Sequence, residues 1–307
     1  MNSVLSTPKY LVAALALCLV YSPTPGLTEN RVRPIDVKAL PVALDPVDPG
    51  FTKIGKLTYR GGLELRSDDK SFGGYSGLIV DTDGRGMLAI SDRGTWLAAK
   101  LSYEDGKLTG VTDARVAAML DADGKPVSGL DKDAEALALD PWGGIITGFE
   151  LHHRITRYAS AENPFGSVPV EMAQPEGLTE APSNKGLEAI AVLGHDRILL
   201  LTEDYRNDDM DTVGWILDDP LDPEASSASP VSFAVSGLFH PTDAAALPNG
   251  DVLVLERRYV AVKGGSMRLR RIPRDEIVPH ARLSGSTLAT VAPPLTIDNM
   301  EAVAVRS

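Results

Sequence analysis

The sequence predicts an all-β fold, a β-propeller built from four-stranded blades. Three observations predict it: a motif that recurs about every 55 residues, turns rich in Gly and Asp inside each repeat unit, and small side chains in the first apolar run of each unit. The composition agrees, because 43% hydrophobic and 23% charged residues are typical of a globular chain that buries a sizeable core.

The repeat is visible as five short segments rich in Ala, Leu and Val. They begin at residues 76, 135, 188, 243 and 301, so the spacings are 59, 53, 55 and 58 residues. Unrelated strands would not keep so regular a period. The segments are Ser76-Gly-Leu-Ile-Val-Asp81, Glu135-Ala-Leu-Ala-Leu-Asp140, Glu188-Ala-Ile-Ala-Val-Leu193, Asp243-Ala-Ala-Ala-Leu-Pro248 and Glu301-Ala-Val-Ala-Val305.

Each of the first four segments is followed by further apolar runs, which we expect to be the remaining strands of a blade. Turns such as Asp83-Gly84, Gly143-Gly144 and Asn249-Gly250 lead into the second run and predict hairpins. The second runs cover residues 86–91, 144–149, 197–202 and 251–255, and the third runs cover 96–103, 154–159, 213–217 and 267–272. Fourth runs at 114–120, 168–172, 231–235 and 288–291 complete the blades.

Small residues in the first run have a geometric reason, because blades crowd together at a propeller axis. The alternative is a set of Ala-rich helices, since Glu-Ala-Leu-Ala-Leu has good helix propensity. Helices of about five residues between Gly and Pro would be marginal, and the runs that follow alternate with period two.

Five units can be counted, and a sixth, divergent unit is left open. The fifth first run ends at Val305, close to the last residue. The run from Ile54 to Leu65 is predicted to be an outermost strand that completes the last blade. Its second and third strands are missing, so we expect the last blade to be incomplete and to leave an open edge, as in a chain shortened at its C-terminus.

The N-terminus has the pattern of an export signal, which we assign to residues 1–26. Lys9 precedes an apolar run from Tyr10 to Tyr21, which is too short for a comfortable membrane span, and a polar segment follows at 22–26. We expect a periplasmic or extracellular protein without a stable membrane span after signal removal. Cys18, the single cysteine, lies inside the signal, so the mature chain has no disulfide. Lipid anchoring at Cys18 is an alternative that Leu17 disfavours.

Residues 27–50 contain four prolines without strong periodicity and are predicted to be an extended lead-in to the propeller domain at 51–307. The formal charge of −12 and the pI near 4.9 exclude a nucleic-acid binder, which needs Lys and Arg to neutralise phosphates. An acidic chain of this kind is better suited to cations.

Several ordered motifs from about Lys53 onward resemble the phytase-like family, described as having esterase-like activity of phytase. They are Gly74-Tyr-Ser-Gly-Leu, Ser91-Asp-Arg-Gly94, Asp133-Ala-Glu-Ala136, Asn184-Lys-Gly-Leu-Glu-Ala189, Leu253-Val-Leu-Glu-Arg257 and Asn299-Met-Glu-Ala302. The resemblance implies a secreted or periplasmic propeller and a phosphoester hydrolase aided by divalent cations. Family members continue past the Asn-Met-Glu-Ala segment with a strand and an acidic turn that this sequence lacks.

The acidic residues that open the repeat segments are the candidate metal ligands: Glu135, Glu188, Asp243 and Glu301. In a propeller they would meet at one mouth of the central channel, where carboxylates cannot all stay ionised without compensation. A hard cation, Ca²⁺ first, would collect their oxygens. Two other readings stay open: each carboxylate accepts backbone N–H groups at a blade junction, or contacts substrate directly.

A second ring is predicted where the second runs end, and its members are the candidate catalytic residues: Asp92, Arg93, His152, Arg154, Glu203, Glu256 and Arg257. Arginine suits phosphate or carboxylate recognition, and a cation can activate water. The alternative is a set of salt bridges between blades. Between the adjacent histidines, His152 is preferred over His153 because it shares the strand parity of Glu150 and Arg154.

The remaining patterns are weaker. The loop from Glu203 to Asp211 carries Asp204, Asp208 and Asp209 and suggests calcium, but it lacks an EF-hand glycine and is equally compatible with a solvated acidic loop. There is no Gly-x-Ser-x-Gly elbow and no zinc-type His and Cys spacing.

The leading hypothesis is an exported phosphoester hydrolase that depends on a divalent cation and acts on a small phosphoester or other anionic substrate. The alternatives are a lactonase-type propeller hydrolase and a propeller that binds ligands without catalysis.

Overall fold

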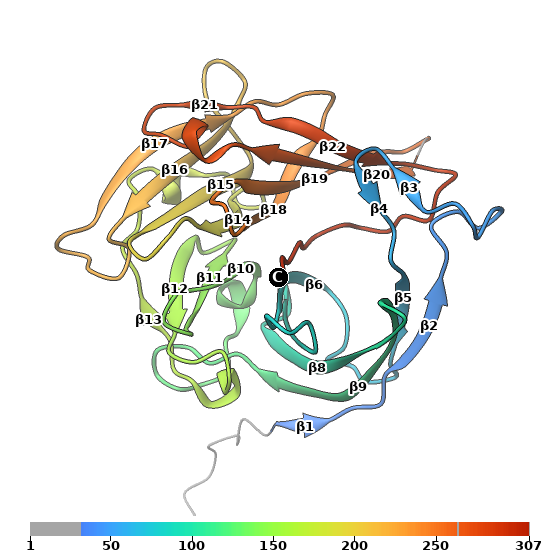
Figure 1. The fold of residues 1–307 in the computed structure, drawn as a ribbon. Helices are drawn as coiled ribbons and strands as arrows, with labels where there is room; N and C mark the ends of the chain where they lie inside the picture. The colour runs from blue at the N-terminus through green and yellow to red at the C-terminus, as the bar shows by residue number, and fades with distance from the viewer. Residues whose placement is uncertain (1–31, 263, 307) are drawn as a thin grey trace, which may run out of the picture.

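Four β-sheets fan around a central axis in the computed structural model, which describes residues 32–262 and 264–306 (Figure 1). The first sheet has the order β1 (Arg33–Pro34), β9 (Lys107–Ala118), β8 (Thr95–Glu104), β7 (Gly86–Ser91) and β6 (Tyr75–Val80). The second has the order β10 (Ala134–Leu139), β11 (Ile145–Phe149), β12 (Arg154–Tyr158) and β13 (Val170–Glu171).

The third and fourth sheets continue around the ring. The third has the order β14 (Leu187–Val192), β15 (Arg197–Arg206), β16 (Thr212–Asp218), β17 (Ser227–Phe233) and β21 (Arg282–Leu283). The fourth has the order β18 (His240–Ala246), β19 (Val252–Val260), β20 (Gly264–Ile272) and β22 (Ser286–Val291). The propeller prediction is therefore confirmed, and each sheet is one blade.

The innermost strands are β6, β10, β14 and β18, which the repeat segments predicted. Adjacent innermost strands contact one another around the axis. The approach is close: a Cβ on Gly77 of β6 would lie 2.5 Å from Leu137 Cβ of β10, so a larger residue does not fit there. Small residues at these positions let the blades converge.

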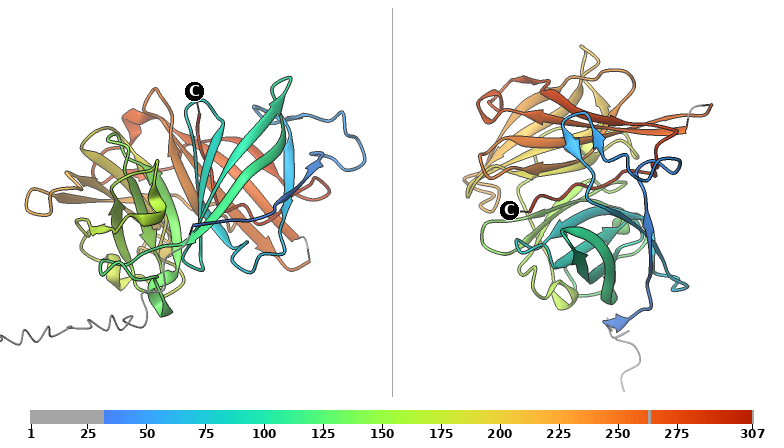
Figure 2. Two further views of the ribbon diagram at one scale, coloured as in Figure 1. Left: turned by 90° about the horizontal axis from the view of Figure 1, so that it is seen from below. Right: turned by 45° about the vertical axis from the view of Figure 1, so that its right-hand side comes forward.

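Residues 300–306 take a fifth place at the axis, between the fourth and first blades (Figure 2). The amide of Val303 donates to Asp243 Oδ2 at 2.7 Å, and Thr242 Oγ1 donates to the carbonyl oxygen of Met300 at 2.9 Å. On the other side, the Arg306 guanidinium lies over the Tyr103 ring of β8. The segment is extended but is not hydrogen-bonded into a sheet.

The single strand predicted at 54–65 is wrong. This run forms β3 (Lys53–Ile54), β4 (Leu57–Thr58) and β5 (Gly62–Arg66). β3 and β4 make a tight hairpin, and β5 pairs with β2 (Lys38–Val42) rather than with 301–305. Gly55 and Gly61 have positive φ angles of 57° and 122°, so the backbone turns twice within the predicted strand.

The lead-in is packed onto the propeller and closes the ring. On the fourth blade, the cluster around Leu255, Met267 and Leu269 is covered by side chains from 44–59 and 295–303. On the first blade, Ile35 and Val37 pack against a cluster that contains Val116, and β1 pairs with β9. The described part of the predicted lead-in, residues 32–50, therefore belongs to the folded body.

The connections contain short 3-10 helices: η1 (Gly129–Lys132), η2 (Pro164–Gly166), η3 (Leu178–Glu180) and η4 (Arg274–Glu276). In the described ranges, no helix has both the length and the apolar character needed to cross a bilayer. The predicted signal at 1–26, with Cys18, lies outside the described residues.

Candidate metal centre at the acidic mouth

A β-bulge recurs at the same point of every innermost strand and aims one side chain per blade at one mouth of the axis. The pairing register shifts between Tyr75 and Gly77, and at the equivalent steps of the other three strands. A bulge leaves one residue outside the ladder and turns its side chain. The residues in the four bulges are Ser76, Glu135, Glu188 and Thr242. We call this end of the channel the acidic mouth.

The placement of Asp243 in this ring is wrong by one residue. Thr242 occupies the bulge, and Asp243 pairs with Leu255 in the regular ladder. Because side chains alternate along a strand, one residue is enough to change the side. The Asp243 carboxylate is buried and accepts the amides of Ala244 and Val303, at 2.8 and 2.7 Å. The Asp243 carboxylate thus connects the fourth blade to Val303. Burial raises the pKa of Asp243 well above the usual range.

The second ring also needs a one-residue correction in the fourth blade. The amides of Asp92, Glu150 and Glu203 donate to the residues that precede the innermost strands, and Arg257 pairs with His240 at the same place. Arg257 is therefore the fourth member of this ring, and Glu256 is not in it.

Glu256 points to the opposite face of the sheet and is fully buried. Arg268 and Arg270 both donate to its carboxylate, at distances between 2.6 and 2.9 Å. Glu256 therefore belongs to a structural ion-pair network between β19 and β20.

His152 and Arg154 lie away from the acidic mouth. His152 is exposed and contacts Asp131 at 2.6 Å. The Arg154 guanidinium stacks on the Phe149 ring at 3.7 Å and donates to the carbonyl oxygens of His152 and Asp131. The parity argument fails because residues 150–153 form a turn, in which Leu151 has a φ of 54°.

His153 is the histidine near the mouth. It is buried, its Nε2 lies 3.0 Å from the carbonyl oxygen of Ala181, and its ring packs against Gly186. Gly186 in turn donates its amide to Glu150 Oε1. His153 therefore supports a backbone group that holds Glu150.

Three carboxylates form the centre of the site. Asp133, Glu135 and Glu150 each offer an oxygen, and these atoms lie within 4.8 Å of one another. Burial, together with the neighbouring carboxylates, raises the pKa of Glu135 and of Glu150 to about 8. A hydrogen bond with Ser76 partly offsets this for Glu135, and the Gly186 amide does so for Glu150. Burial also raises the pKa of Asp133.

Glu188 lies beside these three residues, and the effects that raise its pKa outweigh the nearby positive charge of Arg257. Complete burial raises that pKa well above the usual range, and the charges of Glu135, Glu150, Glu203 and Glu301 raise it further. The protonated form of Glu188 is therefore favoured.

Arg257 neutralises the other side of the mouth. Its Nη1 donates to Glu301 Oε1 at 2.5 Å and to Asn299 Oδ1 at 2.8 Å, and its Nη2 donates to Glu203 Oε1 at 3.0 Å. The pKa of Arg257 is raised: burial opposes this, but the charges of Glu301 and Glu203 outweigh it. The guanidinium thus joins the third blade, the fourth blade and the segment at 300–306.

Asp92 and Arg93 form the rim. The Asp92 Oδ1 atom is buried without a hydrogen-bond partner among the described residues, and Arg93 Nε lies 3.8 Å from it. The negative charge of Asp92 contributes to the raised pKa of Asp133 and of Glu301.

Residues 70–307 match the family model described as phytase-like, esterase-like activity of phytase. The chain belongs to this family. A search of curated proteins found no match.

One similar solved structure is the α-L-arabinofuranosidase PaAbf62A from Podospora anserina in complex with cellotriose, at 14% identity and a TM-score of 0.47, covering 72% of this chain and 69% of that one. Another is described as a gluconolactonase candidate, at 13% identity and a TM-score of 0.41, covering 76% and 68%. Likenesses this low say nothing about activity.

The site of this phytase-like chain contains residues that the sequence analysis did not select. Asp133 stood inside the quoted Asp133-Ala-Glu-Ala motif, and Glu150 marked the second-ring position of its blade but was not chosen as a catalytic or metal-binding residue. Asp133 lies two residues before a predicted strand and Glu150 lies one residue after another, and this closeness to the strand ends was the available signal.

The acidic loop after Glu203 does not gather into a calcium loop. Asp204 is held by Lys185 and Arg206, and Asp211 accepts from Arg282 at 2.9 Å. Their oxygens therefore face different basic partners.

Proposed function

We propose that this phytase-like protein is an exported phosphoester hydrolase that depends on a divalent cation held by Asp133, Glu135 and Glu150. The observation that carries the proposal is the convergence of these three carboxylates, from two neighbouring strand ends, without a basic partner in direct contact. Export is supported by the apolar N-terminal segment, and the phosphoester by the family description.

The donor set fits a hard cation. It consists of carboxylate oxygens alone, which are the ligands of Ca²⁺ and Mg²⁺. The pKa values of Glu135 and Glu150 are raised because burial and neighbouring carboxylates disfavour their negative charges, which a bound cation would compensate. Asp92 Oδ1 adds an acceptor at the rim that has no hydrogen-bond donor among the described residues and only the Arg93 guanidinium at 3.8 Å. A phosphate would be repelled by this mouth unless a cation lay between them.

When bound, a divalent cation would polarise a phosphoryl oxygen. The protein's own residues supply orientation and a proton. Arg257, which is held by Glu301, Asn299 and Glu203, places a positive charge beside the carboxylates that would attract a phosphate. Glu188, a buried carboxyl in the bulge of β14 whose pKa is raised, would supply the proton for the leaving oxygen.

The test combines metal binding with turnover. We expect purified mature protein to bind Ca²⁺ in calorimetry and to hydrolyse p-nitrophenyl phosphate or bis(p-nitrophenyl) phosphate with Ca²⁺ but not with chelator. Glu135→Gln and Glu150→Gln keep the side-chain shape and should each weaken Ca²⁺ binding at least tenfold. Glu224→Gln, an exposed glutamate outside the mouth, is the matched control and should change nothing.

Two outcomes would contradict the proposal. Ca²⁺ affinity that is equal in Glu135→Gln and in the control would remove the metal site. Ca²⁺ binding by a folded protein that hydrolyses neither phosphoester would leave a cation-binding propeller without this activity.

A further inference from the structure

The other end of the central channel is a chamber of about 510 Å³ that the proposed hydrolase does not use. It is lined by the C-terminal halves of β6, β10, β14 and β18 and by residues 303–305. The carboxylates of the acidic mouth lie at the opposite ends of these strands. The chamber therefore opens at the far mouth, and its volume lies within the range of ligand pockets, roughly 300–1,000 Å³.

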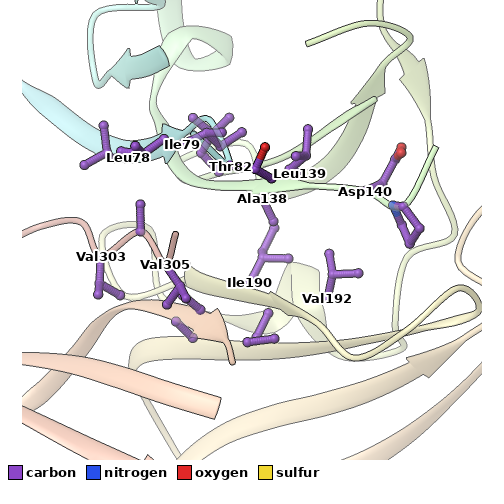
Figure 3. Close-up of a pocket in the computed structure, with 18 of the residues that line it drawn as sticks. Leu78, Ile79, Thr82, Ala138, Leu139, Asp140, Ile190, Val192, Val303 and Val305 are labelled. Atoms are coloured by element: carbon purple, nitrogen blue, oxygen red, sulfur yellow. The ribbon is translucent and has the colours of Figure 1, made fainter. Parts of the chain in front are cut away.

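The walls are aliphatic. In Figure 3, Ile190, Val192, Val303 and Val305 lie around the space. The alanines of the repeat, at 138, 191, 244–246 and 304, leave it open because their side chains are short. Near the opening, Leu139 is 42% exposed, and Trp142, whose ring lies beside the His195 ring, is 55% exposed.

The chamber has no free charge for an ionic ligand. Among the described residues that line it, the acid is Asp140, which is buried. Its carboxylate already accepts the amides of Trp142 and Gly144, both at 2.8 Å, and the Arg157 guanidinium. No Lys or Arg is among these lining residues. A charged group would therefore enter without compensation, which costs free energy.

Polar groups are found at the rim. Thr82 and His195 both line the opening and are exposed, and the His195 ring lies 5.9 Å from the Trp142 ring. A hydroxyl or carbonyl at the mouth can hydrogen-bond to them, while the interior side chains are mainly aliphatic.

We propose that the far chamber binds a neutral amphiphile, with an unbranched aliphatic chain inside and a small uncharged polar head at Thr82 and His195. Aliphatic walls without a free charge select the chain, and the two rim side chains select the head. This site is separate from the acidic mouth and does not depend on its chemistry.

The test is a chain-length series of primary alcohols measured by isothermal titration calorimetry. From 1-hexanol to 1-decanol, each added methylene should tighten the dissociation constant about fourfold until the chamber is filled. 1,8-Octanediol should bind at least tenfold more weakly than 1-octanol, because its second hydroxyl would leave water for a space lined mainly by aliphatic side chains. Chelator should leave all these values unchanged, which separates this site from the proposed hydrolase.

Two variants locate the binding. Ala246→Phe and Ala304→Phe fill the chamber and should each abolish 1-octanol binding, and both alanines are half-buried, so the larger ring has room to turn inward. Ala225→Phe, on an exposed loop outside the chamber, is the control and should bind normally. Equal affinity for 1-octanol and the diol, or binding that survives in both folded filling variants, would overturn the proposal.

Discussion

Glu135 and Glu150 behave differently from surface glutamates because their charges are buried beside other carboxylates. Their pKa values are about 8, whereas the ordinary value is 4.5. Between these values the folded protein holds protons that the unfolded chain has released. The free energy of unfolding therefore decreases as the pH rises through this window.

We expect the melting temperature in chelator to be highest near pH 5 and to fall toward pH 8. Removing one titrating group should flatten the curve, so Glu135→Gln should lose less stability over the same range. Saturating Ca²⁺ should raise the melting temperature more at pH 8 than at pH 5, because bound cations need deprotonated ligands. Circular dichroism melts at pH 5, 6.5 and 8 measure this; parallel curves for the variant and the wild type would contradict it.

The repeat predicted which residue types lie at the acidic mouth, but it did not always predict which exact position supplies them. Glu135, Glu188 and Glu301 lie at the acidic mouth, as their positions in the repeat predicted. Asp243 and Glu256 were selected because they are acidic, whereas Thr242 and Arg257 hold the equivalent places. Matching residues by their acidic type shifted both rings by one residue in the fourth blade, where Thr242 and Arg257 stand in place of acids.

Strand positions were predictable because the turns are strongly marked. β7 follows the Asp83-Gly84 turn and covers the residues expected for it, and β11 begins directly after Gly143-Gly144. The bulges were not predictable, because nothing in the sequence around Ser76 or Glu188 announces an unpaired residue. They decide which side chain turns to the axis, so the fold could be predicted more completely than the site.

Glu256 connects β19 and β20 through two arginines in a buried network. Glu256→Gln would leave Arg268 and Arg270 without their counter-charge, and breaking a buried ion pair on one side costs about 3 to 5 kcal/mol. We expect urea unfolding to show a loss of this size, with Ca²⁺ binding retained because Glu256 is outside the acidic mouth. A loss no larger than that of the exposed Glu224→Gln would show that the network contributes little.

At the scale of the whole molecule, the ring is closed by packing rather than by a complete fifth blade. The lead-in and residues 295–303 cover the fourth blade, and Asp243 fixes Val303. Sequence reasoning identified the incomplete unit, but it could not find this closure because the covering residues have no repeat pattern.

Asp243→Ala should loosen residues 300–306 while the four blades stay intact. Losing the acceptor for the Val303 amide should speed its hydrogen exchange about tenfold, the equivalent of a hydrogen bond worth about 1.4 kcal/mol. Exchange measured by mass spectrometry should show the change in peptides that contain 300–306, and not in β11 or β15. Uniform acceleration across all blades would instead mean that Asp243 supports the entire ring.

The two ion pairs of Arg257 cannot form at the same time while the chain is being synthesised. Its two acidic partners, Glu203 and Glu301, are separated by nearly a hundred positions along the polypeptide, so the charge balance of the mouth is settled only after the ribosome has added residue 301. Before that point, Arg257 can pair with Glu203 but not with Glu301. The second ion pair of Arg257 therefore forms late in synthesis.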